Sequence, residues 1–276
     1  MALPLSPQVF AITSALIEER TGIRHEAGDR DILAEKLSQR AVERGFDSLL
    51  DYYYCLRYDA GAEAELKGLV ETLVVQETYF FRERQPLEAL VDVVLPERLA
   101  HAERAGRKAR VWSAACATGE EPLTLAMMLD ARGLLDRVEI VASDLSARGL
   151  ERAREGAFGG RSLRAFPEAM RAAYTSPLPG GRVAVRPDLV CRVQWENVNL
   201  VDRSAVAKVG SVDAVVLRNV LIYFGDEACR QVAASLAEAL RPGGVLLIGA
   251  SESLLRFGIF DCEERGGAFF YRRPAS

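Results

Sequence analysis

The segment Val111–Pro122, which reads Val-Trp-Ser-Ala-Ala-Cys-Ala-Thr-Gly-Glu-Glu-Pro, constrains the fold more than any other part of this chain. A short apolar run ends in small residues and a glycine, and a helix is expected to begin directly afterwards. Small residues after a strand let the backbone approach a ligand closely, and the first turn of a helix presents unpaired N–H groups. In a doubly wound sheet this crossover holds a nucleotide-like cofactor. The pattern therefore predicts an α/β fold with a cofactor site at the end of the first strand.

Two carboxylates, Glu120 and Glu121, open the expected helix. Acidic residues are favoured at the positive end of a helix dipole, so a solvated first turn is the better explanation when the pair is taken alone. At the mouth of a cofactor site, however, they would repel a pyrophosphate and attract a cationic amino group. This argues against NAD and in favour of S-adenosylmethionine.

From about residue 109 onward, apolar runs alternate with helical segments, which is typical of βαβ units and a mostly parallel sheet. The strands are expected at Ala109–Ala115, Val138–Ser143, Cys191–Asn197, Val212–Leu217 and Val245–Ala250. The intervening helices are expected at Glu120–Ala131, Ala147–Glu155 and Asp226–Leu240, with a turn at Arg241–Gly244. Two short β-rich pieces, Ile259–Cys262 and Ala268–Arg272, predict a terminal antiparallel hairpin at the sheet edge.

Residues 1–88 show helical periodicity instead and predict a small all-α domain, followed by an α/β domain over residues 89–276. Helices are expected at Gln8–Glu19, Asp31–Leu50 and Glu65–Val75. Within residues 156–190 glycine and proline interrupt the βαβ rhythm. This stretch is interpreted as an inserted subdomain with a short helix at Glu168–Tyr174 and a small hairpin around Leu178–Gly181.

Composition limits the classes of function. The net charge is −4, with 10 basic against 16 acidic residues in 1–88 and 25 against 23 in the remainder, so a nucleic-acid-binding protein is not expected. The 5 cysteines are scattered and there are only 2 histidines, which argues against a disulfide framework or a metal centre. Without a signal sequence or a membrane-length apolar run, a cytoplasmic protein without membrane insertion is expected, and a monomer is the default.

Polar residues follow the predicted strands at the edge where ligands bind in such sheets. Asp144 closes the second strand and can accept hydrogen bonds from both ribose hydroxyls, although capping of the next helix is the alternative. Asn197 to Leu200 follow the third strand and offer amide groups to an adenine, but asparagine is also common in turns.

Two further segments carry candidate residues. Arg218 and Asn219 follow the fourth strand, and Tyr223 lies in the apolar run after them, where it either orients a methyl acceptor or is a core aromatic. The segment Gln76–Glu83 ends the helical region, and Thr78 and Arg82 would face one ligand if the helix continued through them. On the helix expected at Asp31–Leu50, Lys36, Arg40 and Arg44 recur at every fourth position.

These segments together resemble the chemotaxis receptor methyltransferase family, commonly called CheR, over nearly the whole chain. The matching motifs are Thr78–Glu83, Trp112–Pro122, Ala142–Asp144, Asn199–Leu200, Arg218–Phe224 and Gly249–Ser253. The resemblance implies a helical N-terminal domain, a Rossmann-like methyltransferase domain and a small β-subdomain inserted in the latter.

The resemblance also implies roles for individual residues. Those that match the family's cofactor contacts are Gln76, Thr78, Arg82, Glu120, Glu121, Asp144, Asn199, Leu200, Arg218 and Asn219. At residue 76 the family often has asparagine, so the amide is retained on a longer side chain. Lys36, Arg40 and Arg44 match the basic character of the family's receptor-docking helix, with a solvated helix face as the alternative.

The implied reaction is S-adenosylmethionine-dependent methylation of glutamate side chains on the cytoplasmic helices of a chemoreceptor. It yields γ-glutamyl methyl esters and S-adenosylhomocysteine. The acceptor carboxylate is already ionised at neutral pH, so no strong base is required, and Tyr223 is expected to orient it. The alternatives are a methyltransferase for another protein or a small molecule, and a non-catalytic scaffold that binds the cofactor as a signal.

Overall fold

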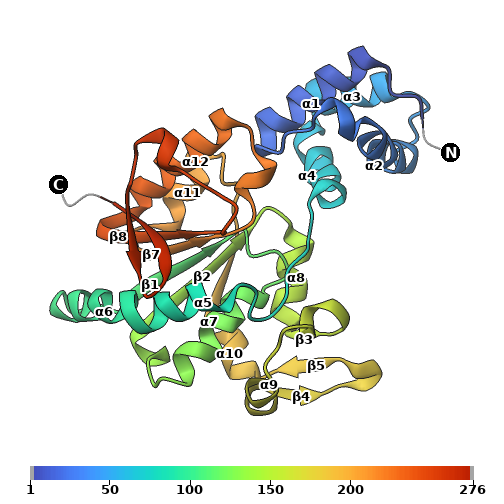
Figure 1. The fold of residues 1–276 in the computed structure, drawn as a ribbon. Helices are drawn as coiled ribbons and strands as arrows, with labels where there is room; N and C mark the ends of the chain where they lie inside the picture. The colour runs from blue at the N-terminus through green and yellow to red at the C-terminus, as the bar shows by residue number, and fades with distance from the viewer. Residues whose placement is uncertain (1–2, 274–276) are drawn as a thin grey trace. The chain divides into compact units, whose positions relative to one another are not determined.

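The computed structural model describes residues 3–273 of the chain (Figure 1). The chain forms two compact units: Met1–Val75 with Tyr223–Cys229, and Gln76–Ile222 with Arg230–Ser276. The domain ranges predicted from the sequence, 1–88 and 89–276, stay predictions, and their outermost residues, 1–2 and 274–276, lie outside the described part of the chain.

The first unit is helical. Its helices are α1 (Pro7–Thr21), α2 (Arg30–Glu43), α3 (Leu49–Tyr58) and α4 (Ala62–Leu73). Local sequence sets the ends of α1, because the Ser6 side chain accepts a hydrogen bond from the Val9 N–H and Gly22 ends the helix in the left-handed conformation at φ 78°. Residues such as Ile17, Leu33 and Leu69 are fully buried between the helices.

The single helix expected at Asp31–Leu50 is wrong. The chain forms two helices there, because α2 ends at Glu43 and Gly45 adopts φ 82°. A new helix then begins at Leu49, where the Ser48 hydroxyl accepts hydrogen bonds from the N–H groups of Leu50 and Asp51. Apolar periodicity continues across the break, so periodicity alone does not reveal it.

The second unit is built on a seven-stranded sheet with the order β6-β2-β1-β7-β8-β10-β9. Its strands are β1 (Ala109–Ala114), β2 (Val138–Asp144), β6 (Val193–Asn197), β7 (Val212–Leu217), β8 (Leu240–Ile248), β9 (Asp261–Arg265) and β10 (Ala268–Arg272). The first five strands are parallel to one another. At one edge of the sheet, β10 pairs antiparallel with β8 and with β9. This confirms the doubly wound, mostly parallel fold with a terminal hairpin.

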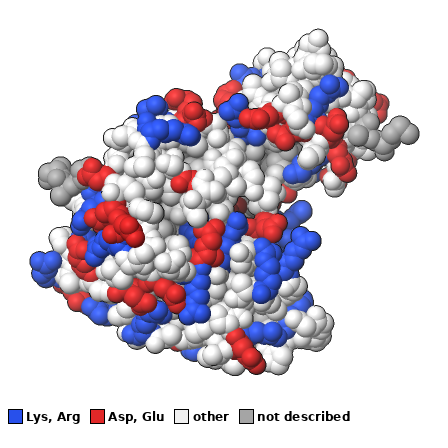
Figure 2. All heavy atoms as spheres, viewed as in Figure 1, with Lys and Arg blue, Asp and Glu red and all other residues white. Residues whose placement is uncertain are grey.

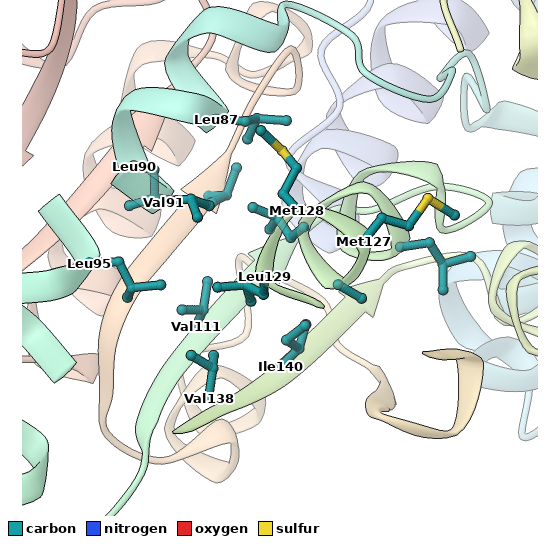
Figure 3. Close-up of a cluster of buried hydrophobic side chains, with 14 of the residues drawn as sticks. Leu87, Leu90, Val91, Leu95, Val111, Met127, Met128, Leu129, Val138 and Ile140 are labelled. Carbon is teal, nitrogen blue, oxygen red and sulfur yellow. The ribbon is translucent and has the colours of Figure 1, made fainter. Parts of the chain in front are cut away.

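Helices lie on both sides of this sheet, with α11 and α12 on one side and α5, α6 and α7 on the other (Figure 1). Their bounds are α5 (Arg84–Ala89), α6 (Leu95–Arg104), α7 (Glu120–Asp130), α8 (Ala147–Glu155), α11 (Arg203–Val209) and α12 (Asp226–Ala239), with the π-helical turn η2 (Leu90–Val94) joining α5 to α6. Figure 3 shows the core on the α7 side, where Leu90 and Leu95 meet Met128 of α7 and Val111 of β1. Because both faces are covered, the central strands β1, β2 and β7 are almost entirely buried.

The insertion predicted between residues 156 and 190 is a small three-stranded sheet in the order β3-β5-β4. It consists of β3 (Ala157–Phe158), the turn η4 (Gly160–Leu163), α9 (Glu168–Tyr174), β4 (Thr175–Pro177) and β5 (Val183–Val185). The helix at Glu168–Tyr174 and the hairpin around Leu178–Gly181 are confirmed.

Three local predictions are wrong. The strand expected from Cys191 begins at Val193, because Cys191 is the last residue of the helix α10 (Pro187–Cys191). The expected turn at Arg241–Gly244 is an irregularity inside β8, where the pairing register shifts between Val212 and Ala214. The segment Gln76–Glu83 is not helical, and Phe81 and Glu83 have φ angles of 60° and 45°. Within residues 3–273, no helix is both long and apolar enough to cross a bilayer.

Candidate cofactor site

The loop between β1 and α7 lies at the carboxyl edge of the sheet, where β1 is flanked by β2 and β7. Ala115, Ala117 and Gly119 all adopt the left-handed conformation, at φ 56°, 51° and 92°. A Cβ atom on Gly119 would lie 2.6 Å from Cβ of Ala153 and 2.9 Å from the Trp195 ring, so only glycine fits. Glycine is therefore required at this position by close packing against Ala153 and Trp195, whereas the close approach of the loop to a ligand stays a prediction.

Asp144 ends β2 and holds this loop against α8. Its Oδ2 accepts a hydrogen bond from the Ala117 N–H at 2.8 Å, and its Oδ1 accepts one from the Ser146 N–H at 2.8 Å. The carboxylate is 8 % exposed. Helix α8 is capped by Ser146 instead, whose hydroxyl accepts from the Gly149 N–H. The capping alternative for Asp144 is therefore wrong, although its ribose role stays a prediction.

Gln76 reaches the same place from the start of the second unit. Its Nε2 donates to the Ser146 hydroxyl at 2.7 Å, and its Oε1 accepts from Nη1 of Arg152 at 3.3 Å. Thr78 is half-buried two residues further along, and its hydroxyl has no hydrogen-bond partner among residues 3–273. The longer amide of Gln76 thus bonds to the serine cap of α8.

Glu120 is buried, with 1 % of its surface exposed. Its Oε2 accepts from the Thr118 hydroxyl at 2.7 Å, and its Oε1 accepts from the Ser162 hydroxyl of η4 at 2.6 Å. Burial raises the pKa of this carboxyl, and the two hydroxyl bonds only partly offset the effect. The solvated first turn that the sequence left open is therefore wrong for Glu120, which joins the inserted subdomain to α7.

Arg218 is the central residue of a cluster of charged side chains at the candidate cofactor site. Its side chain is 1 % exposed and contacts Glu121 and Glu83 at 3.1 Å each. A further bond goes to the Arg82 carbonyl oxygen at 2.8 Å. Glu121 also accepts from the Ser113 hydroxyl at 2.8 Å, and burial raises the pKa of its carboxyl although the Arg218 charge opposes the shift. Arg218 thus faces two carboxylates, and its own Nε is buried without a hydrogen-bond partner among the described residues.

The pKa of Glu83 shifts in the opposite direction to those of Glu120 and Glu121. Burial raises its pKa, but the charge of Arg218 and hydrogen bonds from Arg218 and Asn219 outweigh the burial and hold the pKa below its usual range. The Asn219 amide donates to Glu83 at 3.2 Å. Together these contacts fix the irregular segment that contains Arg82.

Sequence reasoning gave no role to Glu252, which organises the loop after β7. Its two carboxylate oxygens accept hydrogen bonds from four backbone N–H groups: Asn219 at 2.8 Å, Val220 at 2.8 Å, Leu221 at 2.7 Å and Gly249 at 2.7 Å. Asn219 takes the left-handed conformation at φ 58°. A Cβ atom on Gly249 would lie 2.7 Å from Oε2 of Glu252. The only signal in the sequence was the resemblance of Gly249–Ser253 to a family motif.

The loop after β6 completes the carboxyl edge. Asn197 is the register partner of Asp144, and its amide donates to the carbonyl oxygens of Asp144 and Leu145 at 2.9 Å each. Asn199 follows, half-buried, and its side-chain oxygen accepts from the Val201 N–H at 3.3 Å. Leu200 is 6 % exposed. The structure thus brings the ends of β1, β2, β6 and β7 together at one edge.

The remaining candidates belong to the first unit. Tyr223 ends the turn η6 (Leu221–Tyr223), is 38 % exposed, and accepts a backbone hydrogen bond from Arg24 at 2.8 Å. Lys36 donates to the Leu73 carbonyl oxygen at 3.0 Å. Arg40 and Arg44 contact the buried Glu65 at 2.8 and 2.9 Å. All three basic side chains thus have partners on α4.

Known proteins match this arrangement over both units. Residues 76–264 match the model of the CheR methyltransferase SAM binding domain, and residues 9–74 match that of the CheR methyltransferase all-alpha domain. The chain belongs to the CheR methyltransferase family. It is 37 % identical over 260 residues to chemotaxis protein methyltransferase 2 of Vibrio cholerae, covering 93 % of this chain and 89 % of that protein. Chemotaxis protein methyltransferase 1 of Pseudomonas aeruginosa is 33 % identical, covering 89 % and 90 %.

A CheR-family enzyme uses S-adenosylmethionine, and the site suits this cofactor. The carboxylates of Glu120, Glu121 and Asp144 lie at or beside the loop after β1, and two of them are desolvated enough to have raised pKa values. Arg218 contacts Glu121, whereas Glu120 bonds to the hydroxyl groups of Thr118 and Ser162, so a cationic ligand would be favoured beside these two acids. A pyrophosphate, in contrast, would meet repulsion here.

Proposed function

We propose that this protein transfers the methyl group of S-adenosylmethionine to glutamate side chains on the cytoplasmic helices of a chemoreceptor. The observation that carries the proposal is the match to both CheR domains in one chain, in the order all-alpha domain then SAM binding domain. The relatives at 37 and 33 % identity are named as chemotaxis protein methyltransferases. The products are γ-glutamyl methyl esters and S-adenosylhomocysteine.

The cofactor would be held by the carboxyl edge of the sheet. Asp144 accepts hydrogen bonds from the ribose hydroxyls, because it ends β2 with its carboxylate bonded to the Ala117 N–H of the loop after β1. Glu120 and Glu121 offset the charge of the amino group, and Arg82 with Thr78 binds the carboxylate at the same end. Asn199 and Leu200 contact the adenine, and Gln76, Arg218 and Asn219 shape the walls.

When bound, S-adenosylmethionine supplies an electrophilic methyl group on a sulfonium. The acceptor carboxylate is ionised at neutral pH, because the ordinary pKa of glutamate is about 4.3, so the chain needs no base to activate it. Tyr223 donates a hydrogen bond to one acceptor oxygen and leaves the other free to attack. The remaining task of the protein is to place the acceptor and exclude water, which is worth about 7–11 kcal/mol in well-oriented reactions.

Receptor docking is assigned to Lys36 and Arg40 of α2 and to Arg44, which directly follows it. These side chains contact Leu73 and Glu65, so they would bind a receptor through their remaining N–H groups, since a lysine has three donors and an arginine five. The enzyme is proposed to act in the cytoplasm as a monomer. A nucleic-acid partner is not part of the proposal, since the net charge is −4.

The test is transfer of labelled methyl from S-adenosylmethionine to chemoreceptor-containing membranes of the bacterium that encodes the chain. The labelled receptor is then treated with base. We expect base-labile methanol release, which ester linkages give and methylamines do not. Label that resists base, or that enters only small molecules, would contradict the proposal. Cofactor binding without any transfer would instead indicate a non-catalytic scaffold.

A further inference from the structure

The inserted subdomain and α8 carry a concentration of positive charge that the composition of the whole chain conceals. Residues 145–192 contain nine arginines against four acidic residues, a net of +5, in a chain whose net charge is −4. Figure 2 shows Lys and Arg atoms gathered over the region that Figure 1 labels α8. This segment therefore differs in sign from the rest of the protein.

Three of these charges, on Arg152, Arg161 and Arg164, border the cofactor site, and we call them the basic rim. Arg164 lies 3.8 Å above the centre of the Tyr79 ring, and Arg82 lies 5.7 Å from the same ring centre. Arg152 bonds to Gln76, and Arg161 precedes Ser162, which bonds to Glu120. The rim is thus attached directly to residues of the site.

The rim is only partly neutralised by the protein. Arg164 contacts Glu77 at 3.2 Å. Arg152 has a neutral partner, and Arg161 is exposed with no side-chain partner among residues 3–273. Stacking on Tyr79 holds the Arg164 guanidinium flat, so less entropy is lost when its edge binds a carboxylate.

We propose that the basic rim binds an acidic segment of the chemoreceptor next to the glutamate that is methylated. The inference rests on the proposed function, which requires a glutamate-bearing protein helix to approach this edge of the sheet. An acidic segment complements the rim in charge, and arginine binds carboxylates through paired hydrogen bonds. The rim would raise the local concentration of substrate and act on association rather than on the chemical step.

The test compares wild type with Arg161→Glu and with Arg161→Glu/Arg164→Glu, using receptor-containing membranes of the same bacterium. Arg161→Glu breaks no contact within the described chain, so its folding is not at risk. We expect the KM for receptor to rise, about tenfold for the double variant, with an unchanged kcat and an unchanged affinity for S-adenosylhomocysteine. The difference from wild type should shrink as salt rises from about 0.05 to 0.5 M, because exposed charges are screened.

The matched control is Arg203→Glu, a charge reversal at an exposed ion pair with Glu238 in the same unit. An equal KM in wild type and the rim variants, or an equal rise in the control, would overturn the inference. If the rim bound RNA instead of the receptor, the rim variants would lose RNA binding with no change in the receptor KM. That result would also overturn the inference. Failure of wild type to form esters would instead contradict the proposed function, so the two outcomes are distinguishable.

Discussion

Replacement of Glu252 by glutamine tests whether one carboxylate holds the loop after β7. The native side chain accepts four backbone hydrogen bonds, two on each oxygen, at 2.7–2.8 Å. Glutamine has one acceptor oxygen, and its NH₂ group would face two N–H donors. Two bonds to a charged acceptor are therefore lost in Glu252→Gln.

A hydrogen bond to a charged group contributes about 1.5–3 kcal/mol, so the upper limit for two is about 3–6 kcal/mol. Because Glu252 is half-buried, water can replace part of the loss, and we expect about 2–4 kcal/mol of destabilisation. At about 2–4 °C per kcal/mol for a chain of this size, the Tm should fall by about 5–15 °C. The loop from Arg218 to Leu221 should also lose its shape, which would weaken binding of S-adenosylhomocysteine.

The assay is urea unfolding followed by tryptophan fluorescence, because both tryptophans, Trp112 and Trp195, belong to the second unit. Glu264→Gln is the control, since Glu264 is exposed on β9 and the same charge is removed there. Equal stability of the two variants would refute the reasoning that Glu252 organises the loop.

Three further variants test the site. Asp144→Ala should weaken S-adenosylhomocysteine binding about 100-fold by calorimetry, whereas Asp144→Asn should retain more affinity; an unaltered affinity would remove the ribose assignment. Tyr223→Phe should lower kcat about fivefold and leave cofactor affinity near normal, because one neutral hydrogen bond to the acceptor is lost; an unchanged kcat would exclude Tyr223 from the mechanism. Burial raises the folded-state pKa of Glu120 above its ordinary value of 4.5, so its contribution to stability is present at low pH and is lost as pH rises through the raised value. Wild type should therefore lose stability relative to Glu120→Gln as the pH rises above 4.5. Equal changes in the urea midpoints of the two proteins between about pH 5 and pH 8 would contradict this.

Periodicity was sufficient to predict the sheet and most of its helices. The strands at Val138–Asp144 and Val212–Leu217 are mostly apolar and almost entirely buried, as expected of strands covered on both faces. The helix at Glu168–Tyr174 was predictable because proline and glycine isolate it from its neighbours. Short helices could not be predicted in this way. Helix α11 has few residues over which periodicity can be measured. Its start depends on the Asp202 side chain, which accepts hydrogen bonds from the N–H groups of Ser204 and Ala205.

The contacts within the site could not be predicted because they join residues that are far apart in the sequence. The sequence indicated that Glu121 and Arg218 belong to the site, but not that they contact each other, since 97 positions separate them. The link between Ser162 and Glu120 depends on how the insertion folds back, which no local pattern encodes. Similarly, Glu252 contacts the N–H groups of Asn219 to Leu221 across about 30 residues, and backbone donors carry no sequence signal.

These contacts also explain why a residue that matches a cofactor contact of the family need not touch the cofactor itself. Arg218 is 1 % exposed and already bonds to Glu121, Glu83 and the Arg82 carbonyl oxygen, so its main action is on other residues of the site. Removing its charge would leave Glu121 and Glu83 as neighbouring half-buried carboxylates of like charge with no cation between them. The same guanidinium holds Arg82 and its neighbours in their irregular conformation. A match to a family position therefore identifies the site, while the bonds within it decide whether a residue binds the cofactor or holds the residues that do.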